Sequence, residues 1–186
     1  HYYANQVVAR WKLWDGPGYD AATEWVETEF DNLRAGFRWA ADQADPTIAT
    51  AIAAHTATIA SAVQQFEPIG WAEELLPAAI AANLPMLPRL YSAATYCDIL
   101  GRAEDAVGYA ESAVTLQDEP GYQPFPNGWA SHRAAQAHSF AGRPDRSVEI
   151  CTGLAAQTGL ARVLGLCGLT AHLTTAGRSG EAIAIA

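Results

Sequence analysis

The stretch Leu100-Gly101-Arg102-Ala103-Glu104-Asp105-Ala106 decides the fold, because it joins the end of one predicted helix to the start of the next. A glycine after a helix supplies the left-handed residue that a short turn requires. Three further stretches share a glycine followed by a polar start and small residues: Ile69–Leu75, Ala141–Ser147 and Ala176–Ile183. The four glycines, at positions 70, 101, 142 and 177, are 31, 41 and 35 residues apart. Helix–turn–helix units with a period of about 34 residues predict a helical solenoid.

Small residues recur at fixed distances from these glycines, seven positions before and five positions after, at Ala94, Ala135, Ala106, Ser147 and Ala182; Val63 and Thr170 match loosely, and Leu75 is an outlier. Small side chains at such positions let two paired helices approach closely. The pattern resembles that of tetratricopeptide repeats, which implies an all-α fold: a right-handed superhelix of antiparallel helix pairs. Cys97 and Cys151 fall on packing positions of this pattern, so we expect them to be small core residues.

The composition agrees with a soluble helical protein. Alanine, the best helix former, provides 39 of the 186 residues. The formal net charge is -9, which argues against a nucleic-acid-binding surface. The apolar stretches are shorter than the ~20 residues of a membrane span, and residues 1–10 lack the pattern of a signal peptide. Three scattered cysteines fit a reduced, cytoplasmic location.

The sequence predicts no enzyme, no cofactor and no metal site. The single lysine, Lys12, follows Trp11, so the chain has no phosphate-binding P-loop. The five histidines contain no i, i+4 pair, and neither C-x-x-C nor G-x-S-x-G occurs. Any ATPase or cyclase activity would lie outside this chain.

Residues 1–66 are expected to form N-terminal helices ahead of repeats over 67–186, giving a single helical-repeat domain over 1–186. The predicted helix from Asp20 to Ala40, with Asp20 expected as its N-cap, carries an apolar stripe of Val26, Phe30, Leu33, Phe37 and Ala40. Asp45 suits the N-cap of the next helix, and Pro46 its first position. His55 lies on the apolar stripe of that helix, where we expect a partly buried side chain with one satisfied nitrogen.

Two features depart from the repeat. Pro77 falls inside the helix predicted after Gly70 and is expected to kink it or delay its start. The segment 118–128, rich in proline and aromatic residues, lengthens one unit. It is either a packed connector, which we favour, or a contact loop.

The first helix of each pair is expected to line a concave face. That face would carry Tyr91, Thr95 and Asp98 from one unit and Trp129, His132, Gln136 and Ser139 from the next. An aromatic anchor beside hydrogen-bonding side chains suits a peptide or a small polar ligand. The alternative is that this face packs against a neighbouring domain. If the groove binds a ligand, Trp129→Ala should abolish binding while leaving helicity intact.

The stretch Trp25-Val-Glu-Thr-Glu-Phe-Asp-Asn-Leu-Arg-Ala-Gly-Phe-Arg-Trp-Ala40 is the most specific in the chain. It resembles the E-x-D-N-L-R-A-A-x-x-W-A segment of large bacterial regulators of the signal-transduction ATPase type, including LuxR-like and AfsR-like transcriptional regulators. Gly36 departs from the family's alanine. The signature residues are Asp31, Asn32, Arg34 and Trp39, for which bracing of a neighbouring segment is favoured over ligand contact.

The resemblance implies that the chain is a fragment of a larger cytoplasmic regulator. In that family the helical region is the sensor and interaction part, which binds a protein partner, an inducer or the ATPase domain. It implies no direct contact with nucleic acid or membrane, and homo-oligomers are compatible with it. Two alternatives stay open: a regulatory arm of a nucleotide-cyclase or ATPase polypeptide, and a purely structural oligomerisation domain.

Overall fold

A computed structural model of the chain describes residues 1–14, 16–43 and 45–185; Asp15, Ala44 and Ala186, the end of the expected domain, lie outside them. All regular structure in these residues is helical, as predicted. The α-helices are α1 (Tyr2–Trp14), α2 (Tyr19–Thr28), α3 (Phe30–Asp42), α4 (Pro46–Ala60), α5 (Glu67–Ala81), α6 (Leu87–Ala94), α7 (Ala103–Leu116), α8 (Trp129–Phe140), α9 (Pro144–Ala155), α10 (Gly159–Thr175) and α11 (Ser179–Ile185). Short 3-10 helices cover Ser61–Val63 and Thr95–Leu100.

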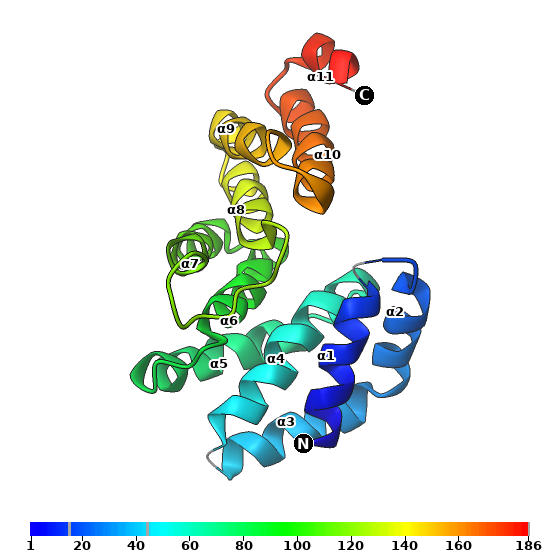
Figure 1. Ribbon diagram of the computed structural model, residues 1–186, viewed down its shortest axis with the longest axis vertical. Helices are drawn as coiled ribbons and strands as arrows, with labels where there is room; N and C mark the ends of the chain where they lie inside the picture. The colour runs from blue at the N-terminus through cyan, green and yellow to red at the C-terminus, as the bar shows by residue number, and fades with distance from the viewer. Residues whose placement is uncertain (15, 44, 186) are drawn as a thin grey trace.

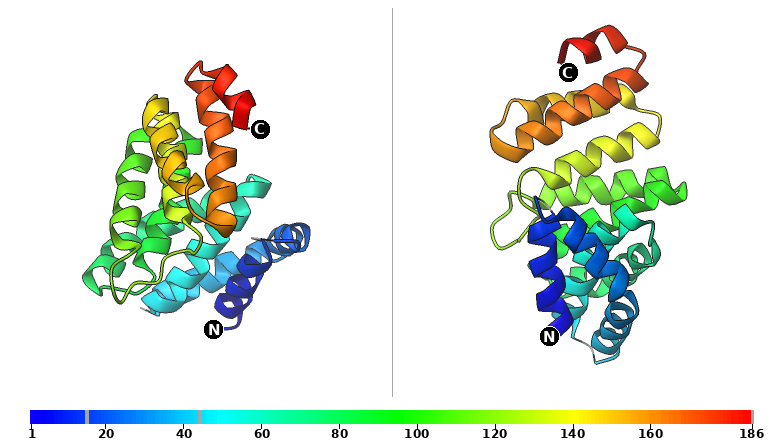
Figure 2. Two further views of the ribbon diagram at one scale, coloured as in Figure 1. Left: turned by 45° about the horizontal axis from the view of Figure 1, so that its top comes forward. Right: turned by 90° about the vertical axis from the view of Figure 1, so that its right-hand side faces the viewer.

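The helices fall into two groups (Figure 1). Helices α1 to α3 pack around α4, and from α4 onward each helix contacts the next one along the chain. The views in Figure 2 show α6 to α11 stacked in chain order, with the two termini at opposite ends of the molecule.

Three of the four predicted corner glycines lie at turns between helices. Gly101, Gly142 and Gly177 have φ angles of 81°, 74° and 75°, the left-handed region in which a side chain is disfavoured. The prediction for Gly70 is wrong, because Gly70 lies inside α5. Pro68 favours the start of α5 before Gly70, and the left-handed turn residue is Gln64 instead.

The helix predicted from Asp20 to Ala40 is divided at Glu29 into α2 and α3. Its apolar stripe is buried as predicted, because the two helices continue the same face toward α4. Asp20 is not the N-cap; Gly18 holds that position, and Asp20 lies in the first turn of α2. Helix α5 begins at Glu67, where Pro68 suits its first turn, and continues through Pro77 to Ala81, so the delayed start expected from Pro77 is wrong.

Helix α4 is the central helix of the N-terminal group. The Asp45 carboxylate accepts a hydrogen bond of 3.1 Å from the Ile48 amide, and Pro46 opens the helix, as predicted. Residues 48–60 are all buried. By length and composition alone, Pro46–Val63 could cross a membrane, whereas the sequence analysis predicted no stretch long enough to do so. In the structure 72% of this stretch is buried inside the protein, as in the core helix of a soluble protein.

The hydrophobic core is continuous across residue 66. One large cluster contains side chains from α1 to α8, and two smaller clusters follow toward the C-terminus. Trp71 of α5 stacks on Phe37 of α3 with ring centroids 4.8 Å apart. The N-terminal helices therefore share this large cluster with α5, α6 and the start of α8.

The buried cysteines and the connector occupy the places expected of them. Burial raises the pKa values of Cys97 and Cys151 to about 11, so both are packed, protonated thiols. The connector 118–128 packs against the N-terminal helices, where Phe125 stacks on Trp11 at 4.7 Å. The Gln123 amide also donates a hydrogen bond of 2.7 Å to the Pro85 carbonyl.

Candidate binding surfaces

Three of the residues predicted to line a ligand groove instead surround Arg133, an arginine in α8 that is only 4% exposed. Its guanidinium donates hydrogen bonds to Thr95 Oγ1 at 3.0 Å and to Asp98 Oδ2 at 2.8 Å. It also donates to Gln136 Oε1, and it lies 3.9 Å from the centre of the Tyr96 ring. Thr95 and Asp98 are thus engaged inside the protein, where they join α6 and its 3-10 extension to α8.

Arg133 is the residue that the sequence interpretation missed. It follows the buried Ala130 by three positions and precedes the buried Ala137 by four, so it lies on the inward stripe of α8. A charged residue on such a stripe indicates a buried partner of opposite charge. Burial raises the pKa of Asp98, while the Arg133 charge acts in the opposite direction.

Trp129 is a core residue at the junction of α1 and α8. Its ring contacts Trp14 edge-on at 5.4 Å and His132 at 5.5 Å. Burial lowers the pKa of His132 to about 4, so its imidazole is neutral at pH 7. Because Trp129 is buried, Trp129→Ala is expected to lower stability, and loss of binding alone would not identify a ligand contact.

The remaining groove candidates lie elsewhere. Tyr91 and Ser139 are half-buried, and Tyr91 faces Tyr109 of α7 with ring centroids 6.4 Å apart. The structure therefore does not gather the seven predicted residues into one groove.

Among the family-signature residues at the surface of α3, Arg34 makes the contact that braces a neighbouring helix. Arg34 pairs with Asp31 in its own helix and donates from Nε to Glu67 Oε2 of α5 at 2.8 Å. The Asn32 amide donates a hydrogen bond of 2.7 Å to Glu29. Arg34 holds the pKa of Glu67 below its usual value. Trp39 is 57% exposed.

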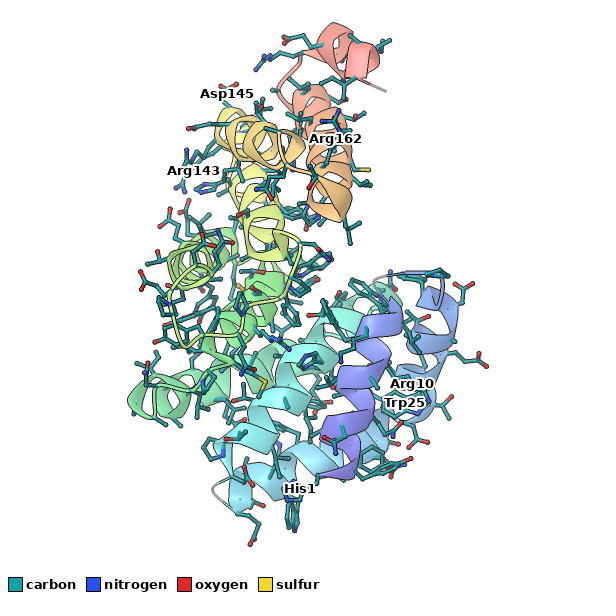
Figure 3. The ribbon with its side chains drawn as sticks, in the orientation of Figure 1. His1, Arg10, Trp25, Arg143, Asp145 and Arg162 are labelled. Carbon is teal, nitrogen blue, oxygen red and sulfur yellow. The ribbon has the colours of Figure 1, made fainter. Side chains whose placement is uncertain are left out.

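Figure 3 shows a contact between α1 and α2, where the Arg10 guanidinium lies over the Trp25 ring, 5.3 Å from its centre.

His55 is completely buried beneath the connector. Its Nδ1 lies 2.7 Å from the Ala51 carbonyl, and its Nε2 lies 3.1 Å from an Arg89 nitrogen. The arginine can only donate, so Nε2 accepts and Nδ1 carries the proton. His55 is a core residue as expected, but it is completely rather than partly buried, and both nitrogens rather than one are satisfied. Burial lowers the pKa of His55 to about 4, and the nearby Arg89 charge contributes to this shift.

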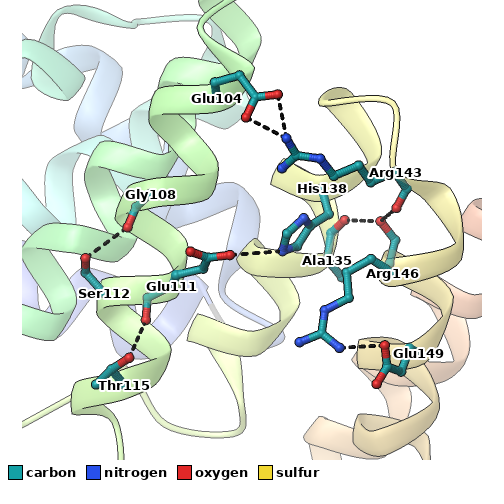
Figure 4. Close-up of polar contacts among 11 residues, drawn as sticks. Glu104, Gly108, Glu111, Ser112, Thr115, Ala135, His138, Arg143, Arg146 and Glu149 are labelled. Carbon is teal, nitrogen blue, oxygen red and sulfur yellow. Dashed lines mark hydrogen bonds and ion pairs between the residues drawn. The ribbon is translucent and has the colours of Figure 1, made fainter.

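Three adjoining hollows lie along α7. A hollow of about 590 Å³ between α5, α6 and α7 adjoins a second of about 370 Å³, with which it shares Tyr91, Gly108 and Ser112. A third, of about 380 Å³, shares Glu111 and Thr115 with the second and reaches α8 and α9. We name these three hollows the α7 groove; Figure 4 shows its α7–α9 part.

The α7 groove has acidic and apolar sides. Glu73, Glu104, Asp105 and Glu111 line its first two hollows, and no lysine or arginine lines these two in the described residues; Arg146 lines the third. On the α5 side the lining is apolar, with Leu76, Pro77 and Ile80. Tyr109 lies between these sides and donates a hydrogen bond of 3.2 Å to Glu73. Burial and the Glu73 charge raise the pKa of Tyr109 to about 12, so the hydroxyl stays protonated.

The described residues contain no group of three or more His, Cys, Asp or Glu side chains that could hold a metal ion. No protein-family model matches the chain, and comparisons with curated proteins and with solved structures find no match. The functional interpretation therefore depends on the residues and their geometry.

Proposed function

We propose that this chain is a non-catalytic interaction and sensor module of a multidomain bacterial transcriptional regulator, acting in the cytoplasm. In this proposal it binds a protein partner, an inducer or a neighbouring ATPase domain. Helices α6 to α11 form tetratricopeptide-like pairs in a right-handed superhelix. The left-handed turn glycines at 101, 142 and 177 support the repeat, and the resemblance of residues 25–40 supports the regulator.

The observation that carries the proposal is the α7 groove. Its lining comes from five successive helices, α5 to α9, so that neighbouring helices together build one surface. This is how stacked helical repeats create extended binding surfaces. Arg133 and His55, by contrast, are engaged in contacts inside the protein.

The test uses the complete polypeptide that contains this chain. We expect a nucleotide-binding motif before it and a DNA-binding helix-turn-helix after it in the same polypeptide. Deleting residues 67–186 from that polypeptide should change its ATPase activity or its DNA binding by several-fold. Unchanged regulation after deletion would contradict the sensor role.

Two alternative functions make different predictions. If the chain is an arm of a nucleotide cyclase or ATPase without DNA binding, a cyclase domain should occupy the same polypeptide. If it is a structural oligomerisation domain, light scattering should show a stable homo-oligomer that no added ligand alters.

A further inference from the structure

The carboxylates of the α7 groove are only partly neutralised by the protein. Glu73 binds Arg102 at 2.7 Å, and Glu104 binds Arg143 at 2.8 Å. Asp105 lies 3.7 Å from the same Arg102 guanidinium, which already pairs with Glu73. Its side chain is 59% exposed, so it remains accessible to a partner.

Glu111 lines the second and third hollows; Arg146, which also lines the third, is paired with Glu149, so in the described residues no ion pair with an arginine engages Glu111. Its carboxylate lies 3.9 Å from His138 Nε2, as Figure 4 shows. Burial lowers the pKa of His138, so its imidazole is mainly neutral at pH 7 and does not offset the Glu111 charge. On α7 itself, the sequence from Ala103 to Leu116 contains three acidic residues and no basic one.

Next to these charges lie the surfaces that an amphipathic segment needs. Tyr91 and Tyr109 offer aromatic rings, which attract guanidinium and ammonium groups. Ile80 is 51% exposed at the apolar side of the same hollow. A ligand that fits must therefore carry positive charge toward α7 and apolar side chains toward α5.

We propose that the α7 groove binds a basic amphipathic peptide segment of a partner protein, with arginine or lysine side chains toward Asp105 and Glu111 and apolar side chains toward Leu76 and Ile80. This inference rests on the proposed interaction function and names the partner's chemistry. A peptide is favoured over a small cation because the three adjoining hollows extend from α5 to α9. Nucleic acid is disfavoured by the acidic lining.

The test measures binding of a fluorescein-labelled twelve-residue helical peptide to the full chain by fluorescence anisotropy. The peptide is made of arginine, leucine and alanine, with arginines on one face and leucines on the other. A counterpart carries glutamate in place of every arginine. We expect the arginine peptide to bind, with affinity that falls as salt rises, and the glutamate peptide not to bind. Equal affinity for both peptides would overturn the proposal.

Gly108 allows the groove to be blocked without disturbing the core. It is exposed on α7, lines the first two hollows, and a Cβ atom there would meet no atom within 4 Å. Gly108→Arg should place a positive charge in the groove and weaken peptide binding at least about tenfold, or about 1.4 kcal/mol. Gly153→Arg is the matched control, because Gly153 is an exposed helical glycine of α9 with the same open space and does not line the hollows described.

The pair of variants separates a local effect from a general effect of charge. Both change the net charge equally, so nonspecific attraction of the basic peptide should fall equally in both. Weakening confined to Gly108→Arg supports the groove, whereas equal weakening overturns it. Asp105→Asn with Glu111→Gln should also weaken binding by about tenfold, with the circular dichroism spectrum unchanged. If the arginine peptide still binds both Gly108→Arg and the Asp105→Asn, Glu111→Gln double variant with unchanged affinity, the groove proposal fails. The proposed function is tested separately, by the deletion experiment on the complete polypeptide.

Discussion

The core that α5 shares with the N-terminal helices and the core of the C-terminal helices α9 and α10 are packed in different ways. Around α3 and α5, large rings fill the core: Trp71 stacks on Phe37 at 4.8 Å and on Phe30 at 5.9 Å. Around α9 and α10, the buried cluster contains no aromatic ring among the described residues, and its members are Ala135, Val148, Cys151, Leu169, Leu173 and Ala182. There the backbones of α9 and α10 lie close together. Gly165 permits this approach because it has no side chain, and a Cβ atom at this position would clash with the backbone of Ala155.

This difference predicts opposite weaknesses. A core of large rings is most sensitive to truncation, which leaves a cavity. A close helix–helix contact is most sensitive to added atoms, which force the helices apart. Substitutions in the two regions can therefore test the comparison, and we take them from the largest expected effect to the smallest.

Trp71→Ala should have the largest effect. The indole is 1% exposed, and its removal leaves a cavity between Phe30 and Phe37. The expected loss is about 3–5 kcal/mol in the free energy of unfolding, measured by urea denaturation. Trp39→Ala is the matched control, because Trp39 is 57% exposed; it should change stability by less than about 0.5 kcal/mol. Similar losses in both variants would show that the ring stack does not dominate the N-terminal core.

Asp98→Asn tests the boundary between the two regions. It removes one charge of the buried pair and leaves the Arg133 guanidinium without a counter-ion at 4% exposure. Breaking such a pair from one side is expected to cost about 3 kcal/mol, again by urea denaturation. Glu74→Gln breaks the exposed pair with Arg38 and should leave the midpoint nearly unchanged. A small effect of Asp98→Asn would mean that water replaces the lost contact.

The Asp98–Arg133 pair also marks where prediction from the sequence ends. Helical periodicity located the buried stripe of α3, and turn chemistry located Gly101, Gly142 and Gly177, because both signals are local. The partner of Asp98 is 35 residues away, and no local pattern encodes that contact. The turn predicted at Gly70 was wrong because a local signal was itself ambiguous. The neighbours of Gly70 resemble those of the other turn glycines, but Pro68 favours the start of the helix before it. The α7 groove likewise required the packing of five helices to be known.

The third prediction concerns pH and acts on the N-terminal region. The pKa of His55 is lowered to about 4 in the folded protein, from an ordinary value of 6.5. The stabilisation by the neutral imidazole is therefore fully present above pH 6.5 and is lost as the pH falls toward 4. Between pH 7 and pH 5 the loss is about 2 kcal/mol.

Urea denaturation at both pH values, with His55→Gln as the comparison, measures this contribution. The variant lacks the titrating group, so its stability should fall by about 2 kcal/mol less than that of the natural sequence over the same interval. His132, whose pKa is also lowered to about 4, titrates in both proteins and cancels in the difference. Parallel loss in both proteins would contradict a neutral, buried His55.

The last prediction applies one chemical change to two glycines of the C-terminal region. A Cβ atom at Gly165 would lie 2.3 Å from the Ala155 backbone nitrogen, so Gly165→Ala must separate α9 from α10 and should cost about 1–2 kcal/mol. At Gly153 the space is open, and Gly153→Ala should stabilise the protein by about 0.5–1 kcal/mol through helix propensity alone. Thermal unfolding of both variants should give midpoint shifts of opposite sign. If Gly165→Ala also raised the midpoint, the helix pair would be held by side chains rather than by close backbone approach, and the contrast with the aromatic N-terminal core would disappear.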